Sequence, residues 1–219
     1  MSVVEPGMSW TAVLPVKELA IAKSRLGAGP EARAGLALAM ARDVAAAAAS
    51  CPAVNAVLVV TDDPLVADKV PADRVEPDVP RAGLSAAVAH GASAALSRWP
   101  RAGVVVLAAD LPALTSTALS EVLAALVDGR GVVADSAGTG TVLLATRPGT
   151  ALAPSYEGAS FAAHRAGGAV DLTAVAAAGV RRDVDTVEDL AAALVLGVGP
   201  ATWDSVREHR ASWQAAGLL

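Results

Sequence analysis

Asp110 is the carboxylate of this 219-residue chain whose position is most informative, because it directly follows the apolar run 104–109 and precedes Pro112. An unbroken apolar run of this length predicts a strand covered on both faces, as in a parallel sheet, and such sheets bind ligands beyond the carboxyl ends of their strands. Pro112 cannot donate a ladder hydrogen bond, so the chain must leave the strand just after the carboxylate. Asp110 is therefore a candidate site residue, with a turn or helix-capping aspartate as the alternative.

Two further carboxylates, Asp183 and Asp185, are separated by a single valine. On an extended segment the side chains at i and i+2 point the same way. Two carboxylates so close repel unless a cation joins them, and Mg²⁺ prefers carboxylate oxygens together with substrate phosphates. A helix start at Thr186, capped by Thr186 or Asp185, would explain at most one of the two aspartates. We therefore expect Asp110, Asp183 and Asp185 to hold Mg²⁺.

Lys17, Lys23 and Arg25 lie between the first predicted strand and the first long helix, and the chain has only one other lysine, Lys69. In an open α/β sheet this crossover commonly binds phosphate through backbone N–H groups and cationic side chains. Neither the P-loop pattern nor the dinucleotide glycine pattern is present. The three cations are thus candidate phosphate ligands, and a solvated basic loop is the alternative.

Small and hydroxyl residues mark three further candidate positions. Thr141 offers a hydroxyl at a strand start after the glycine-rich segment 135–140, which also suits a tight hairpin. Ser160 could cap a helix whose N–H groups bind an anion, and His164 could contact substrate or be structural. The helix entry at 83–87 could hold a base or ribose.

The elements that must position these residues alternate along the chain. Strands are predicted at 10–16, 56–60, 74–76, 104–109, 131–134, 141–145 and around 181–184. Helices are predicted at 31–50, 65–70, from the loop 80–85 to about 98, and at 116–127, 161–166, 172–177, 187–196 and 201–215. This order predicts an α/β three-layer sandwich with a mostly parallel sheet, in which 131–134 and 141–145 pair antiparallel. We expect a single domain over 10–219 after a flexible extension, 1–9.

Composition narrows the functional class. The chain is 54% hydrophobic but only 3% aromatic, which suits helices packed closely on a valine-rich sheet. Its net charge of −5 argues against a broad nucleic-acid surface, and no apolar run is long enough to span a membrane. The single cysteine, Cys51, excludes an intrachain disulfide and a cysteine zinc cage. The start of the sequence does not resemble a signal peptide, so a cytoplasmic location is expected.

Taken in order, the motifs PVK, AKSRL, GLSAA, AADLPAL, GTGT, GASFAAH and DVDTVEDL resemble the 2-phospho-L-lactate/phosphoenolpyruvate guanylyltransferases of coenzyme F-420 biosynthesis. The resemblance covers residues 10–199. DLPAL alone also occurs in nucleotidyltransferases of molybdenum-cofactor synthesis. The segment LGVGPAT, residues 196–202, is similar to the actinobacterial branch, which is associated with phosphoenolpyruvate.

This resemblance implies a nucleotide-diphospho-sugar-transferase-like (Rossmann-like) fold, with GTP and phosphoenolpyruvate giving enolpyruvoyl-2-diphospho-5'-guanosine and pyrophosphate. It implies Mg²⁺ ligation by the three aspartates and catalytic roles for Asp110 and the basic loop. It further implies acceptor contacts at Thr141, Gly158 and Ser160, and nucleotide phosphate contacts at Lys17, Lys23 and Arg25. Gly83 and Ser85, at the helix entry, are the candidate contacts to the base or ribose. The family commonly has asparagine within the motif where this chain has Ser85 and Ala86.

Several alternatives remain at this stage. The acceptor could be 2-phospho-L-lactate or 3-phosphoglycerate instead of phosphoenolpyruvate. A molybdenum-cofactor nucleotidyltransferase would usually carry a glycine-rich first loop, which residues 14–17 replace here. A non-catalytic nucleotide-binding domain would not need three metal-binding aspartates. Expected partners are the small-molecule substrates and a downstream transferase that consumes the product, with a homodimer as a further possibility and neither nucleic acid nor membrane involved.

Overall fold

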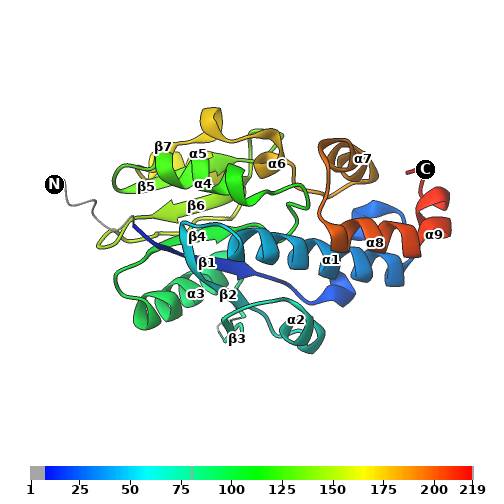
Figure 1. The fold of residues 1–219 in the computed structure, drawn as a ribbon, viewed down its shortest axis with the longest axis horizontal. Helices are drawn as coiled ribbons and strands as arrows, with labels where there is room; N and C mark the ends of the chain where they lie inside the picture. Colours follow the sequence, from blue (N-terminus) through cyan, green and yellow to red (C-terminus); the bar gives the residue numbers. More distant parts are fainter. Residues whose placement is uncertain (1–7, 80, 219) are drawn as a thin grey trace.

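The computed structural model describes residues 8–79 and 81–218, and a seven-stranded mixed sheet forms its centre (Figure 1). The strand order is β3-β2-β1-β4-β6-β5-β7. The strands are β1 (Trp10–Pro15), β2 (Val54–Val60), β3 (Arg74–Glu76), β4 (Gly103–Leu107), β5 (Arg130–Ala134), β6 (Thr141–Thr146) and β7 (Val170–Asp171). β6 pairs antiparallel with β4 and β5, whereas the other pairings are parallel. The mostly parallel sheet and the antiparallel β5–β6 pair are both confirmed.

Helices cover both faces of this sheet, which confirms the three-layer arrangement (Figure 1). On one face α1 (Pro30–Ala49) and α4 (Ser116–Ala125) pack against alternate residues of β1 and β4. On the other face α3 (Leu84–Arg98) packs against β1, β2 and β4, with Phe161 of α5 (Ser160–Ala166) beside the same cluster. Because both faces are covered, the central strands are buried almost throughout.

Short connecting helices complete the first half of the chain. They are α2 (Pro64–Lys69) and the 3₁₀ turns η1 (Leu19–Ile21) and η2 (Ser24–Leu26). The Asp63 carboxylate caps α2 by accepting the N–H groups of Leu65 and Val66. Cys51 is buried in the turn between α1 and β2.

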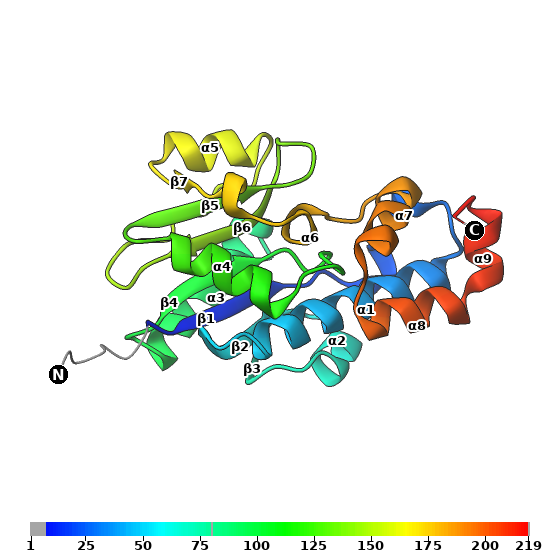
Figure 2. The same ribbon diagram turned by 45° about the horizontal axis from the view of Figure 1, so that its top comes forward.

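The C-terminal helices form a third apolar cluster with the first half of α1. They are α7 (Val187–Leu196), α8 (Pro200–Glu208) and α9 (Arg210–Ala215). The short helix before them, α6 (Ala178–Arg181), packs through Val180 in the cluster that contains α1 and α4. α8 lies alongside α1 in both ribbon views (Figures 1 and 2). Trp213 is fully buried there, together with Leu26 and Val184. Two segments far apart in the sequence, near residues 26 and 184, are thus fixed by one cluster.

The prediction of a strand around 181–184 is wrong. Arg181 ends α6, residues 182–186 have no strand pairing, and β7 takes the sheet edge beside β5. The alternation of polar and apolar residues arises because Val184 is buried in the C-terminal cluster while Asp183 and Asp185 are not. The predicted helix 172–177 is only the 3₁₀ turn η3 (Thr173–Val175), and the predicted helix 201–215 is divided at His209 into α8 and α9.

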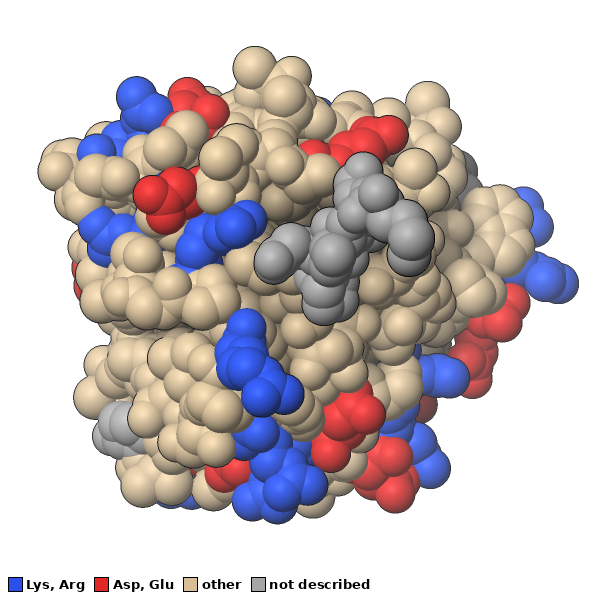
Figure 3. Space-filling view, turned by 60° about the vertical axis from the view of Figure 1, so that its left-hand side comes forward, with Lys and Arg blue, Asp and Glu red and all other residues tan. Residues whose placement is uncertain are grey.

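Residues 1–7 of the predicted extension lie outside the described residues, and Met8 and Ser9 lead into β1. No described helix is long and apolar enough to cross a membrane. On the face shown in Figure 3, basic side chains lie among acidic ones and uncharged surface. That the protein does not bind nucleic acid stays a prediction.

Candidate active site

The candidate site lies where the strand order reverses. From β1 the chain proceeds to β2 and β3 on one side, then returns through α3 to β4 on the other side of β1. In such sheets, ligands bind at this switch point, beyond the carboxyl ends of the strands. The loop after β1 carries Lys23, and the loop after β4 carries Asp110, so the topology brings the two predicted groups together.

Two adjoining cavities open at this place, of about 300 and 500 Å³. Both are lined by Pro15, Val16, Lys17 and Leu84. The larger cavity also contacts the predicted site residues Lys23, Asp110 and Asp185. Gly83 lines the smaller cavity, whereas Arg25 is exposed on η2 and lines neither.

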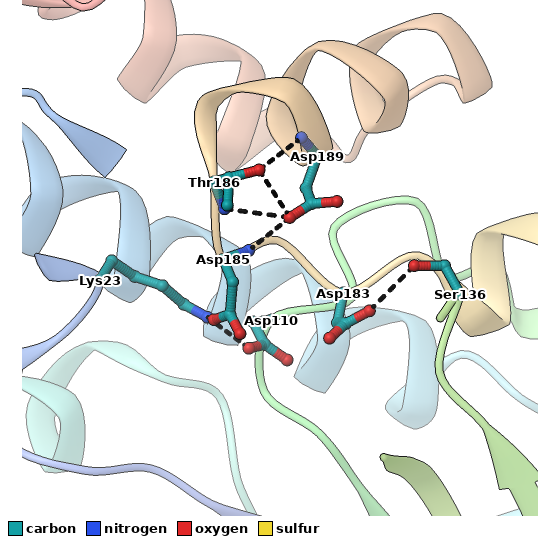
Figure 4. A network of polar contacts seen from close by, with 7 residues as sticks. All are labelled: Lys23, Asp110, Ser136, Asp183, Asp185, Thr186 and Asp189. Carbon is teal, nitrogen blue, oxygen red and sulfur yellow. Dashed lines mark hydrogen bonds and ion pairs between the residues drawn. The ribbon is translucent and has the colours of Figure 1, made fainter. Parts of the chain in front are cut away.

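Lys23 links two of the predicted metal ligands (Figure 4). Its ammonium donates to Asp110 Oδ2 and, at 2.8 Å, to Asp185 Oδ1, and its side chain is only 12% exposed. Burial lowers the pKa of Lys23, but the adjacent Asp110 and Asp185 carboxylates outweigh that effect, so the pKa lies above its usual value. Lys23 therefore holds carboxylates here, whereas the sequence predicted a phosphate contact.

The backbone of Lys23 has φ +55° and ψ +39°, the left-handed conformation that non-glycine residues seldom adopt. It lies between η1 and η2, and the η1 turn is fixed by Leu19 N–H, which donates to Asp63 Oδ2 at 2.9 Å. Such strain persists where the surrounding structure fixes it, and it concentrates at functional sites. The loop thus directs the Lys23 side chain into the cleft.

Asp183 lies beside this pair with a different environment. The Val184 N–H donates to Asp110 O at 3.1 Å, which fixes the segment against the loop after β4. The Asp183 carboxylate faces Ser136 at 3.5 Å (Figure 4). Burial, and then the negative charges of Asp110 and Asp135, raise the pKa of Asp183 to about 6. An excess of negative charge therefore surrounds this carboxylate.

A capping box at the start of α7 fixes the same segment. Thr186 accepts the N–H of Asp189, and the Asp189 carboxylate accepts the N–H groups of Thr186 and Asp185. Arg182 holds Asp189 from the other side at 3.2 Å. Thr186 is the cap, so neither the Asp183 nor the Asp185 carboxylate is needed for capping.

The donor set suits Mg²⁺, which prefers carboxylate oxygens. Within the described residues no three carboxylate, histidine or cysteine side chains are grouped as metal ligands. The Lys23 ammonium lies between Asp110 and Asp185. The surplus negative charge at Asp183 nevertheless fits a divalent cation at this place. Asp110, Asp183 and Asp185 are the side chains that would hold it.

The predicted acceptor residues form a second polar group. Thr141 begins β6, as expected, and its Oγ1 lies 3.2 Å from Ser160 Oγ and 3.0 Å from His164 Nδ1. Ser160 is the first residue of α5 and not its cap, which corrects the prediction. Gly158 has φ +65° and open space where a Cβ would stand, so the chain turns there with its backbone uncovered.

The remaining predicted residues serve local structure. Ser85 donates to Glu157 Oε2 and accepts the Tyr156 N–H, both at 2.8 Å, so it joins α3 to the acceptor-side loop. Asp135 closes segment 135–140 into a hairpin by accepting the N–H groups of Thr139 and Gly140. The tight-hairpin alternative therefore describes this segment.

Three lining residues of the smaller cavity are absent from the sequence prediction: Asp62, Asp78 and Arg81. Asp62 follows β2 as Asp110 follows β4, so the same strand-end signal could have identified it. Arg81 Nε donates to Asp62 Oδ2 at 2.8 Å, a contact that no spacing in the sequence indicates.

Comparison with solved structures identifies the class to which this fold belongs. It is similar to a candidate nucleotide-diphospho-sugar transferase from Desulfovibrio desulfuricans, with a TM-score of 0.64 and 20% identity over 95% of this chain and 99% of that one. A nucleotidyl transferase from Methanothermobacter matches with a TM-score of 0.60 and 18% identity, over 83% of this chain and 94% of the other. The architecture is that of the nucleotide-diphospho-sugar transferases.

Sequence comparison narrows this class to one family. Residues 10–214 match the family described as "Guanylyl transferase CofC like", and the chain belongs to it. A phosphoenolpyruvate guanylyltransferase of Streptomyces scabiei is 50% identical over 204 residues, which cover 89% of this chain and 94% of the relative. One from Salinispora arenicola is 50% identical over 200 residues, covering 88% and 91%.

Proposed function

We propose that this protein is a phosphoenolpyruvate guanylyltransferase that joins GTP and phosphoenolpyruvate into enolpyruvoyl-2-diphospho-5'-guanosine with release of pyrophosphate. The structural observation that carries the proposal is the meeting of Lys23, Asp110 and Asp185 in one cleft at the switch point of the sheet. Half of the aligned residues, over 89% of the chain, are identical to those of relatives named phosphoenolpyruvate guanylyltransferase. The reaction would serve coenzyme F-420 biosynthesis.

The chemistry needs no protein nucleophile. A phosphate oxygen of phosphoenolpyruvate attacks the α-phosphorus of GTP, a new P–O bond forms, and the bond to the pyrophosphate group breaks. Catalysis then consists of positioning and charge neutralisation. Lys17 is exposed at the cleft and makes no ion pair within the described part of the chain, so its ammonium is free to bind a phosphate group. Arg25 lines neither cavity, so it would have to reach a phosphate group from the edge of the cleft.

Mg²⁺ is part of the proposal. Bound by Asp110, Asp183 and Asp185, it would supply charge neutralisation for the triphosphate and the departing pyrophosphate. Asp110 and Asp185 would then bind the ion in place of the Lys23 ammonium, and Lys23 would be available to bind the nucleotide phosphates. Gly83 and Ser85, at the start of α3, are proposed to border the nucleoside.

The acceptor is proposed to bind at Thr141, Gly158 and Ser160. These residues stand near the carboxylates: Leu107 pairs with Leu143, and Ala108 N–H donates to Val142 O at 2.9 Å. By continuation of this register, Thr141 lies beside the segment that leads from β4 to Asp110. A cytoplasmic location, a homodimer and a downstream transferase that consumes the product complete the proposal, and these three rest on the sequence expectations alone.

Pyrophosphate release by the purified protein tests the function directly. With Mg²⁺ present, four nucleoside triphosphates are crossed against phosphoenolpyruvate, phospho-L-lactate and 3-phosphoglycerate, with the product-consuming transferase included to remove an unstable product. We expect release with GTP and phosphoenolpyruvate. Pyrophosphate release only with another acceptor would identify that acceptor as the substrate in place of phosphoenolpyruvate. GTP binding without pyrophosphate release under every condition would favour a non-catalytic nucleotide-binding domain.

A further inference from the structure

His164 is buried against the acceptor residues, and both of its ring nitrogens are occupied. The residue is 3% exposed, and its ring meets the edge of Tyr156 with centroids 5.0 Å apart. Nε2 accepts the backbone N–H of Ser155 at 2.8 Å, and Nδ1 lies 3.0 Å from Thr141 Oγ1. With both nitrogens engaged inside the protein, the imidazole does not itself contact substrate.

These contacts determine which nitrogen carries the proton. A backbone N–H can only donate, so Nε2 must be unprotonated, and a neutral imidazole then carries its hydrogen on Nδ1. Burial and then the Arg130 charge lower the pKa of His164 below its usual value, against smaller opposing effects of the Ser160 backbone and Glu157, and this favours the neutral ring. His164 therefore donates to Thr141 Oγ1.

The direction of this bond decides what the hydroxyl groups present to a ligand. Thr141 and Ser160 have two hydroxyl hydrogens, and the bond between them uses one, with Ser160 donating. Because His164 donates as well, Thr141 Oγ1 accepts two hydrogen bonds and its own hydrogen is left to point elsewhere. With the opposite tautomer, the Thr141 hydroxyl would donate its hydrogen to Nδ1. If Ser160 still donated to Thr141, neither hydroxyl would have a hydrogen left for a ligand, and their oxygen lone pairs would repel an anion.

We propose that His164 is a positioning residue that fixes the Thr141 hydroxyl as a donor to an anionic oxygen of the acceptor. The inference rests on the proposed function, in which Thr141 and Ser160 bind phosphoenolpyruvate. According to this inference, acceptor binding depends on the tautomer of His164 as well as on the hydroxyl groups of Thr141 and Ser160. The His164 side chain acts through Thr141 without contacting the substrate, and the Ser155 backbone N–H fixes its orientation.

Two substitutions at one position provide a matched test. His164→Asn keeps an N–H donor near the place of Nδ1, whereas His164→Gln reaches the place of Nε2 and removes the donor to Thr141; both remove the contact with Tyr156. We expect His164→Gln to raise the KM for phosphoenolpyruvate about tenfold, the scale of one hydrogen bond, and to leave the KM for GTP within about twofold. His164→Asn should restore the acceptor KM to within about threefold of wild type. Equal acceptor KM values for the two variants would overturn the inference.

A double-mutant cycle with Thr141→Val separates positioning from simple packing. Once the hydroxyl is gone, His164→Gln should change the acceptor KM no further, because the two residues act as one unit. Additive effects would overturn the inference.

A measurement on the wild-type protein does not depend on the folding of any variant. The ¹⁵N shifts of the His164 ring should show a protonated Nδ1 and an unprotonated Nε2, and a protonated Nε2 would overturn the inference even in an active enzyme. Absence of pyrophosphate release with every acceptor would instead overturn the proposed function, and with it the assignment of an acceptor to Thr141. The two failures are thus distinguishable.

Discussion

Lys23 combines a left-handed backbone, a buried ammonium and two carboxylate partners. A partly buried ion pair such as Lys23–Asp110 is tolerated when both partners are satisfied, whereas a partly buried carboxylate without a partner is costly. Asp110 and Asp185 therefore have a counter-ion before any metal arrives. Asp183 has no ion-pair partner among the described residues, and its burial and then the nearby Asp110 carboxylate raise its pKa to about 6.

Replacement of Asp183 should stabilise the protein and abolish turnover. The pKa is about 6 in the folded state against 3.8 in the reference state, so the stability that protonated Asp183 contributes is fully present below pH 3.8 and is lost as the pH rises through about 6. We expect Asp183→Asn to be more stable than wild type by about 1–2 kcal/mol at pH 7.5, allowing for partial exposure, and equally stable near pH 3.8. Thermal unfolding at a series of pH values without Mg²⁺ measures this difference.

Asp68→Asn is the control for this pH dependence, because Asp68 is an exposed carboxylate paired with Lys69. Its stability difference from wild type should stay small at every pH. A constant difference for Asp183→Asn across the same range would contradict the raised pKa. Full activity of Asp183→Asn at saturating Mg²⁺ would contradict its role as a metal ligand.

At the scale of elements, the capping box of α7 couples helix stability to the geometry of the site. Thr186 and Asp189 hold the N–H groups that follow Asp183 and Asp185. Thr115 also caps a helix, α4, by accepting the Ala118 N–H at 3.2 Å, but Asp110 stands five positions before this cap, whereas Asp185 directly precedes Thr186. The chain thus has two threonine caps that differ in how near, along the chain, they lie to a predicted site aspartate.

Thr186→Ala and Thr115→Ala should each lower the free energy of unfolding by about 1 kcal/mol. Only Thr186→Ala should also lower kcat/KM, by about tenfold, because the two aspartates lose the segment that orients them. Urea unfolding and steady-state pyrophosphate release measure the two effects. An equal loss of kcat/KM in both variants would show that the capping box has no special connection with the site.

The sequence predicted the elements whose signals are local. The buried strands β1, β2 and β4 depend on nearby residues, and each was located within one to two residues at most ends. The segment 182–186 was misread because burial of Val184 comes from helices that follow it in the sequence. Likewise, the contact of Lys23 with Asp185 joins residues 162 positions apart, and no spacing rule reaches that far.

At the scale of the whole molecule, the C-terminal helices hold all three segments of the site. Leu26 and Val184 are buried in their cluster, and Gly199 N–H donates to Pro112 O at 2.9 Å. Asp43 of α1 fixes α8 by accepting the N–H groups of Ala201 and Thr202 at 3.0 and 2.7 Å. A Cβ at position 199 would overlap the Asp43 carboxylate, so glycine is needed for this close approach.

Asp43→Ala should lower the free energy of unfolding by about 2–4 kcal/mol, because two N–H groups at the start of α8 lose a charged, buried acceptor. Asp43→Asn keeps an acceptor oxygen and should lose less. Urea unfolding of both variants measures the difference. If Asp43→Ala were as stable as wild type, the attachment of α8 to α1 would not depend on this carboxylate.

The packing of α8 on α1 also has a consequence for the nascent chain. Asp43 and Ala201 are 158 positions apart, which at about 5–20 residues per second corresponds to roughly 8–30 s of synthesis. During that interval Leu36 and Met40, which the C-terminal cluster buries, have no cover from α8 or α9. Residues 200–215 must therefore be synthesised before the segments that carry Lys23 and Asp185 gain this support, and we expect the nascent chain to be inactive until then.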